Sequence, residues 1–111
     1  MIVRIWRGME KRGEAGAYRR HLEGAVLPQL KALPGFMGAS LLQRGVEGET
    51  EVLVMTRWAS MDAIRVFAGE EPETAVVEPE ARALLSSFDD KVTHHELAFE
   101  LPLNVASAPN A

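Results

Sequence analysis

The run His94-His95-Glu96 near the end of the chain holds two of its three histidines. Imidazole changes charge close to neutral pH, so either histidine is a candidate proton acceptor. In a strand, alternation sends His94 and Glu96 to one face and His95 to the other. Apolar Leu97 and Phe99 share the face of His95, which favours a His95 side chain directed towards the core. The alternative is that both histidines make structural hydrogen bonds or lie at an interface. The proton acceptor is therefore predicted to be His94 or His95.

A metal site in the same run finds little support. His94 and Glu96 share a face, but they offer only two ligands, and a protein metal site ordinarily has three or four. The chain has no cysteine, which excludes disulfides, thiolate catalysis and sulfur-ligated metal centres. We therefore predict no metal.

Three aromatic residues are candidates for binding a flat molecule. Trp58 ends a predicted strand, where its indole can stack on a ligand and donate its N–H to an oxygen. Tyr18 belongs to the apolar stripe of a predicted helix, three residues before His21, and Phe67 lies on the buried side of another. We predict that Trp58, Tyr18 and Phe67 line a substrate pocket. The alternative for each is an ordinary place in the hydrophobic core.

The composition limits the classes to which the protein can belong. At 111 residues, with 47% apolar and 25% charged residues, the chain is expected to form one globular domain. Its net charge of −4 argues against a nucleic-acid partner. No apolar run approaches the roughly 20 residues that span a bilayer, and the start does not read as a signal peptide. We expect a cytoplasmic protein that does not bind membranes.

Strands and helices alternate in the pattern that must position these candidates. Alternating β-branched and aromatic residues predict strands over 1–7, 36–44, 51–58 and 91–101. Apolar residues at three- and four-residue steps predict a helix over 14–33, with a kink or a late restart at Pro28, and a helix between Ser60 and Gly69. A short helix is predicted over 79–88, and Gly45 to Glu49 is the expected hairpin loop.

This order is the split βαβ arrangement of α+β ferredoxin-like folds, with a four-stranded antiparallel sheet and helices on one face. We assign it to residues 1–101 as one domain and predict a flexible tail over 102–111. The uncovered face of the sheet also receives apolar residues, which predicts a homodimer through this open face. Arg4 and Trp6 share a face of the first strand and are expected at the dimer contact, with Arg4 paired to a carboxylate such as Glu96.

The segment Val54-Met-Thr-Arg-Trp-Ala-Ser60, followed by Ala63-Ile64 and Phe67-Ala-Gly69, resembles the third strand and next helix of antibiotic biosynthesis monooxygenase domains. Similar residues also fall at Tyr18, at Leu33-Pro-Gly-Phe36 and at Val92-Thr-His-His-Glu96. The resemblance covers residues 1–101. It implies a dimeric α+β barrel, in which two sheets pack face to face, and a cavity between each sheet and its helices. Trp58 matches the family's tryptophan at the end of the third strand.

The same resemblance implies a chemistry. The best-known oxygenases of the family use no cofactor and oxidise anthrone-type polyketide intermediates to quinones, because the deprotonated substrate reacts with oxygen directly. We therefore expect a cofactor-independent monooxygenase for a small aromatic or polyketide-like molecule. The alternative is a non-catalytic dimer that binds a hydrophobic ligand. Haem degradation is a distant third. The haem-degrading relatives have an asparagine on the first strand, where this chain carries Arg4 and Trp6. They also have a haem-ligating histidine on a helix in the second half, whereas residues 59–88 of this chain contain no histidine.

Overall fold

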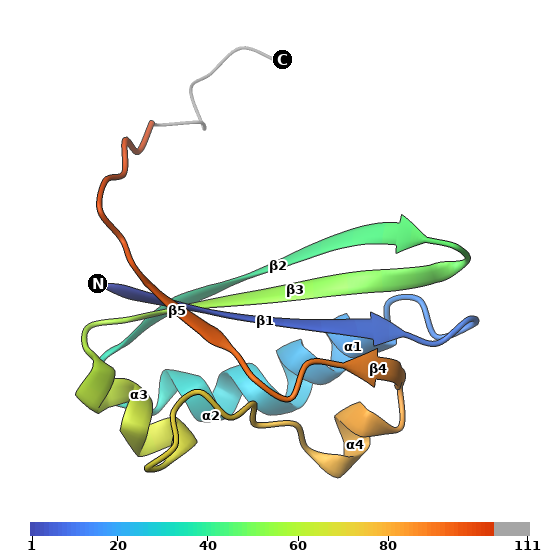
Figure 1. Ribbon diagram of the computed structural model, residues 1–111, viewed down its shortest axis with the longest axis horizontal. Coiled ribbons are helices and arrows are strands. Elements are labelled where there is room, and N and C mark those ends of the chain that lie inside the picture. The colour runs from blue at the N-terminus through green and yellow to red at the C-terminus, as the bar shows by residue number, and fades with distance from the viewer. Residues whose placement is uncertain (104–111) are drawn as a thin grey trace.

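The computed structural model describes residues 1–103, so most of the predicted tail over 102–111 lies outside the described residues. A sheet is covered by helices on one face only (Figure 1). In chain order the elements are β1 (Ile2–Glu10), α1 (Ala17–His21), a π-helical turn η1 (Leu22–Val26), α2 (Leu27–Lys31), β2 (Phe36–Val46), β3 (Glu49–Trp58), α3 (Met61–Ala68), α4 (Pro79–Arg82), β4 (Leu85–Phe88) and β5 (Thr93–Glu96).

The antiparallel sheet has the order β2-β3-β1-β4, and β5 also pairs with β1. β1 and β3 pair along their whole length, from Ile2 opposite Trp58 to Glu10 opposite Thr50. β2 and β3 form a hairpin whose turn residues, Glu47 and Gly48, both have positive φ, as a two-residue hairpin turn requires. The predicted ferredoxin-like α+β fold is confirmed, and its fourth strand is split into two short pieces.

The split of the fourth strand corrects two predictions. The expected helix over 79–88 ends at Arg82, and Leu85–Phe88 form β4, because Phe88 pairs with Gly8 and packs its ring on Trp6. The expected strand over 91–101 is confined to β5. Its last bond to β1 runs from the Leu97 amide to the Met1 carbonyl. Beyond this bond the chain leaves the sheet on the side away from the helices (Figure 1).

The first helix is continuous from Ala17 to Lys31 and widens into a π-turn over Leu22–Val26. Pro28 lies two residues beyond Val26, and because proline lacks an N–H it cannot donate an α-helical hydrogen bond to the preceding turn. The structure thus has a π-turn before Pro28, where the sequence predicted a kink or a late restart at the proline. π-turns of this kind often lie at functional sites, and Leu22 and Val26 face the cavity described below.

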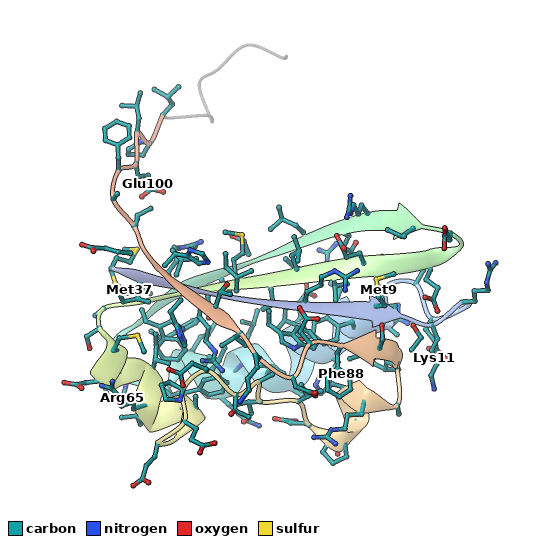
Figure 2. The ribbon with its side chains drawn as sticks, viewed as in Figure 1. Met9, Lys11, Met37, Arg65, Phe88 and Glu100 are labelled. Carbon is teal, nitrogen blue, oxygen red and sulfur yellow. The ribbon has the colours of Figure 1, made fainter. Side chains whose placement is uncertain are left out.

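Strand alternation divides the side chains of β1 between two environments. Arg4 and Trp6 are buried on the helix-facing side, where both lie among residues of the first helix. Side chains fill the space between the helices and the sheet (Figure 2). Ile5 lies on the open face, next to Met55 of β3, and Arg7 shares that face. Arg7 and Arg44 both bind Glu51 at 2.7 Å, and these hydrogen bonds lower the pKa of Glu51 to about 2. The open face thus combines apolar side chains with one paired polar cluster.

Within residues 1–103, no helix is long and apolar enough to cross a membrane.

Candidate functional site

A small cavity lies between the helix-facing side of the sheet and the helices. It has two lobes, an inner one of about 60 Å³ and an outer one of about 40 Å³. Arg4, Val54, Thr56 and Val92 belong to the inner lobe alone, whereas His21, Gln29 and Glu78 belong to the outer lobe alone. Six mostly apolar residues line both lobes: Trp6, Tyr18, Val26, Leu30, Phe67 and Val76.

Arg4 places a positive charge on the wall of the inner lobe. The residue is 5% exposed, and its guanidinium donates to the carbonyl of Pro72, to that of Thr74 at 3.0 Å and to Nε2 of His94 at 2.9 Å. It also lies over the ring of Phe67, 5.6 Å from the centroid. Burial lowers the pKa of Arg4 to about 10, against the opposing effect of Glu73, so Arg4 stays charged at neutral pH. Within the described residues no carboxylate forms an ion pair with it.

This position overturns the expected pairing of Arg4 with Glu96 at a dimer contact. Glu96 is exposed and lies opposite Ile2, one alternation further along the strand pair. Arg4 instead turns inward, where backbone carbonyls replace a carboxylate as acceptors. A buried cation held only by neutral acceptors attracts an anionic group from a ligand.

His94 is held in a defined tautomer by Arg4. A guanidinium donates and never accepts, so Nε2 of His94 is the acceptor and the ring proton resides on Nδ1. Burial and, next, the charge of Arg4 lower the pKa of His94 below its ordinary value. His94 is therefore neutral at pH 7, with its Nε2 lone pair directed at Arg4.

His95 lies on the opposite, open face of the sheet. It is exposed, pairs across β1 with Val3, and its Nε2 lies 2.9 Å from Oγ1 of Thr93. The expected orientation towards the core is wrong, because the apolar residues that suggested it, such as Phe99, follow the end of β5 and lie outside the sheet. Of His94 and His95, it is His94 that the structure brings close to the cavity, through its contact with Arg4.

Tyr18 lines both lobes with a buried side chain. Burial, assisted by the charge of Glu78, raises the pKa of Tyr18 to about 12. The phenol therefore stays protonated and acts as a hydrogen-bond donor, not as a base. No hydrogen bond to its hydroxyl comes from residues 1–103, which leaves that donor available to a ligand.

Phe67 and Trp58 form successive layers. Phe67 lines both lobes, and Trp58 stacks against it from behind, with ring centroids 5.7 Å apart. Trp58 is fully buried, packs edge-on against Phe36, and donates its N–H to Oγ1 of Thr56 at 2.9 Å. Trp58 thus supports Phe67 and Thr56, which line the inner lobe, while its own indole belongs to the core.

Sequence reasoning did not identify Arg4 and Trp6 as cavity residues, or the loop over 69–78 as the cover. The shared face of Arg4 and Trp6 was visible from alternation alone. The side of the sheet was not, because apolar residues occupy both faces. The loop reads as a solvated acidic run, yet Arg4 binds two of its carbonyls, and Val76 closes both lobes.

A larger, more open hollow of about 380 Å³ lies between η1 and the edge strand β2. Its charged residues, Arg19 and Glu23, bind each other at 2.8 Å. Because this pair neutralises itself, the hollow presents no uncompensated charge, and the two-lobed cavity is the stronger candidate site. The described residues contain no group of three or more side chains able to hold a metal ion.

Most of the chain, including β1 and the helix that carries Tyr18, matches a known protein family. A family model described as antibiotic biosynthesis monooxygenase matches residues 1–78. The chain belongs to this family. No curated protein matches the chain significantly.

Solved structures of this family's fold resemble the chain at low sequence identity. A candidate antibiotic biosynthesis monooxygenase of Bacillus cereus is 19% identical, with a TM-score of 0.65 over 92% of this chain and 95% of the other. A monooxygenase of Streptomyces coelicolor in complex with nanaomycin D is 19% identical, with a TM-score of 0.60 over 92% of each chain. The haem degrader MhuD of Mycobacterium tuberculosis, with two haems bound, is 23% identical, with a TM-score of 0.59 over 92% of this chain and 100% of the other. These likenesses establish the fold.

Proposed function

We propose that the chain is a cofactor-independent monooxygenase-like enzyme that oxidises a small aromatic or polyketide-like molecule with O2. The observation that carries the proposal is the buried Arg4 on the wall of an aromatic-lined cavity, which forms no ion pair within residues 1–103 and donates a hydrogen bond to His94. Family membership and the likeness to a monooxygenase bound to nanaomycin D support the same class of reaction.

The proposed substrate carries a methylene group activated by a neighbouring carbonyl. When its carbonyl oxygen takes a hydrogen bond from Arg4, that bond replaces the one from Arg4 to His94, and the Nε2 lone pair of His94 becomes free to accept a proton from the methylene group. Arg4 then stabilises the resulting enolate oxygen, and the protonated Tyr18 is available as a second donor.

The oxygen step needs no electron donor other than the substrate. The enolate carbon gives electrons to O2 and forms a C–O bond, which yields a hydroperoxide after protonation. Loss of the remaining C–H proton with cleavage of the O–O bond releases water and leaves a carbonyl. The balance is that one methylene group and one molecule of O2 give one carbonyl group and one molecule of water. One oxygen atom is kept in the product, and both methylene hydrogens leave in the water.

The closed cavity requires its cover to move before a substrate enters. A cavity of about 150 Å³ holds one benzene molecule, and the inner lobe here is about 60 Å³. Val76 lines both lobes and is 48% exposed, so displacement of the segment at Val76 is the shortest route to a larger cavity. The same comparison argues against haem, because a porphyrin is far larger than benzene, and Arg4 and Trp6 occupy the wall of the inner lobe.

A non-catalytic ligand-binding role is the second candidate. It is favoured by one observation, which is that the Nε2 lone pair of His94 accepts a hydrogen bond from Arg4. A ligand that leaves this hydrogen bond in place finds no free base among the described residues at the inner lobe. In this role the cavity would bind an aromatic anion without turning it over.

Oxygen uptake with an anthrone probe, in buffer containing a metal chelator, separates the two candidates. We expect protein-dependent uptake that falls about a hundredfold in His94→Gln, which retains an acceptor for Arg4 but cannot take the proton. Arg4→Lys, which keeps the charge but loses the planar fork, should also slow uptake. His95→Gln tests the competing histidine and should leave uptake unchanged. Absence of uptake by the wild-type protein would leave the binding role, and loss of uptake in His95→Gln alone would contradict the assignment to His94.

We also propose that the chain forms a homodimer through the open face of the sheet. Ile5, Leu53 and Met55 lie half-buried on this face and Leu42 is 46% exposed, which leaves apolar area uncovered in a single chain. Packing two such faces against each other would produce the dimeric barrel implied by the family.

A further inference from the structure

The two lobes of the cavity carry opposite charges at opposite ends. Arg4 lies at the inner end, and the described residues provide no ion pair for it. Glu78 lies at the outer end and likewise forms no ion pair with any of residues 1–103. Six mostly apolar residues line both lobes, and we call the space that they line the apolar channel.

The outer end is built from groups that recognise a hydrogen-bond donor. Glu78 is half-buried at the start of α4, and it does not cap that helix with its side chain, so its carboxylate is not committed to the backbone there. It lies close enough to Tyr18 to raise the pKa of the phenol. His21 and Gln29 complete the polar rim of the lobe.

We propose that the cavity binds a small aromatic ligand with an anionic oxygen at one end and a hydrogen-bond donor, such as a hydroxyl or an amine, at the other. Arg4 binds the anion, the carboxylate of Glu78 accepts the hydrogen bond of the donor, and the apolar channel encloses one ring once the segment at Val76 has moved and enlarged the cavity. This inference deepens the proposed function by naming a substrate class. It rests on the proposed function only in that both use the same cavity.

The direction of binding follows from electrostatics. The reverse orientation would place the ligand anion beside the negative charge of Glu78 and its hydrogen-bond donor beside Arg4, which is itself only a donor. Both contacts would be unfavourable. Because the channel is apolar and partly shielded from water, the opposite charges of Arg4 and Glu78 discriminate more strongly there than on the surface. Glu78 is therefore a specificity residue, distinct from the groups proposed to act on the reacting carbon.

The inference is tested by calorimetric titration with three ligands of similar size. 4-Hydroxybenzoate has both end groups, 4-fluorobenzoate lacks the donor, and 4-hydroxybenzamide lacks the negative charge. We expect the wild-type protein to bind 4-hydroxybenzoate about tenfold more tightly than either of the others, as a hydrogen bond to a charged group implies.

The variant Glu78→Gln, whose amide oxygen is a weaker acceptor than the carboxylate, should reduce the preference over 4-fluorobenzoate and keep the preference over 4-hydroxybenzamide. The matched control is Glu80→Gln, an exposed residue of the same helix that does not line the cavity, and it should keep both preferences. Equal binding of the hydroxy and fluoro acids by the wild type, an unchanged preference in Glu78→Gln, or no binding of any probe would each overturn the inference. Oxygen uptake with anthrone is measured separately, so failure of the oxygenase proposal alone would leave the binding preferences intact.

Discussion

The side chain of Glu10 accepts a hydrogen bond from the backbone N–H of Tyr18, with Oε2 and N 2.9 Å apart. Glu10 ends β1 and is fully buried, while Tyr18 is the second residue of α1. The residue before the helix is Gly16, which has no side chain with which to cap it. A carboxylate from the strand therefore performs the capping, and it ties the start of the helix, and with it Tyr18, to the sheet.

Removing this cap should destabilise the protein and displace Tyr18. We expect Glu10→Ala to lower the free energy of unfolding by about 1–3 kcal/mol, from the lost cap and the space left in the core. Glu10→Gln retains an acceptor for Tyr18 and should cost less. Urea unfolding followed by circular dichroism measures both. Equal loss in the two variants would show that the carboxylate charge, and not the accepted hydrogen bond, holds the helix.

The pH dependence of stability should report His94. Because folding lowers the pKa of His94, the unfolded chain binds a proton more readily than the folded one as the pH falls below the ordinary histidine range. Stability is then fully present above a pH of about 6.5 and declines as the pH falls towards the lowered value. Unfolding free energies between pH 8 and 5 should fall for the wild type and fall less for His94→Gln, which keeps an acceptor for Arg4.

Glu51 does not interfere with that measurement. Its hydrogen bonds to Arg44 and Arg7 lower its pKa to about 2, so it loses its charge well below the range in which His94 titrates. An identical slope in the wild type and His94→Gln would assign the pH dependence to another group and contradict a depressed pKa of His94.

The sequence predicted the order of the elements because strands and helices have different apolar periods, and those periods are local. It did not predict the break in the fourth strand, since Leu85 and Phe88 fit a helical spacing and a strand equally well. What decides between them is pairing with Gly8 and Glu10, some eighty residues away. Long-range pairing of this kind leaves no local signal.

The candidate site was partly predictable for a related reason. Tyr18 and Phe67 both line the cavity. Each lies on the apolar face of its helix, and the apolar period of the sequence identifies that face. Alternation places Arg4 and His94 on fixed faces of their strands, yet it cannot say which face the helices cover. The covered face depends on the side to which the helical connections pass. The register of β1 with β5 places Arg4 opposite His94, so both lie on that face.

The two tryptophans should separate support of the cavity from contact with its ligand. Trp58→Phe removes volume from the core and leaves the Thr56 hydroxyl without its donor, which should cost about 1–3 kcal/mol of stability. Trp6 lines both lobes itself and donates to the Asp89 carbonyl at 2.9 Å. We expect Trp6→Phe to weaken ligand binding more than Trp58→Phe does. Urea unfolding and 4-hydroxybenzoate titration give the two readouts. A Trp58→Phe variant of unchanged stability that loses binding would restore the initial prediction that Trp58 contacts the substrate.

The homodimer can be tested at the centre of the open face. Met55 lies there on β3, between Ile5 of β1 and Ser40 of β2. In a two-fold interface each substitution appears twice on surfaces that meet, so Met55→Glu places two desolvated carboxylates in one apolar contact. We expect the wild type to elute as a dimer and Met55→Glu as a monomer in size-exclusion chromatography with light scattering. The matched control is Val66→Glu, because Val66 is 69% exposed on α3, away from the sheet, and it should remain dimeric. A monomeric wild type would contradict the homodimer. A dimer that survives Met55→Glu but not Val66→Glu would place the interface on α3 and not on the open face of the sheet.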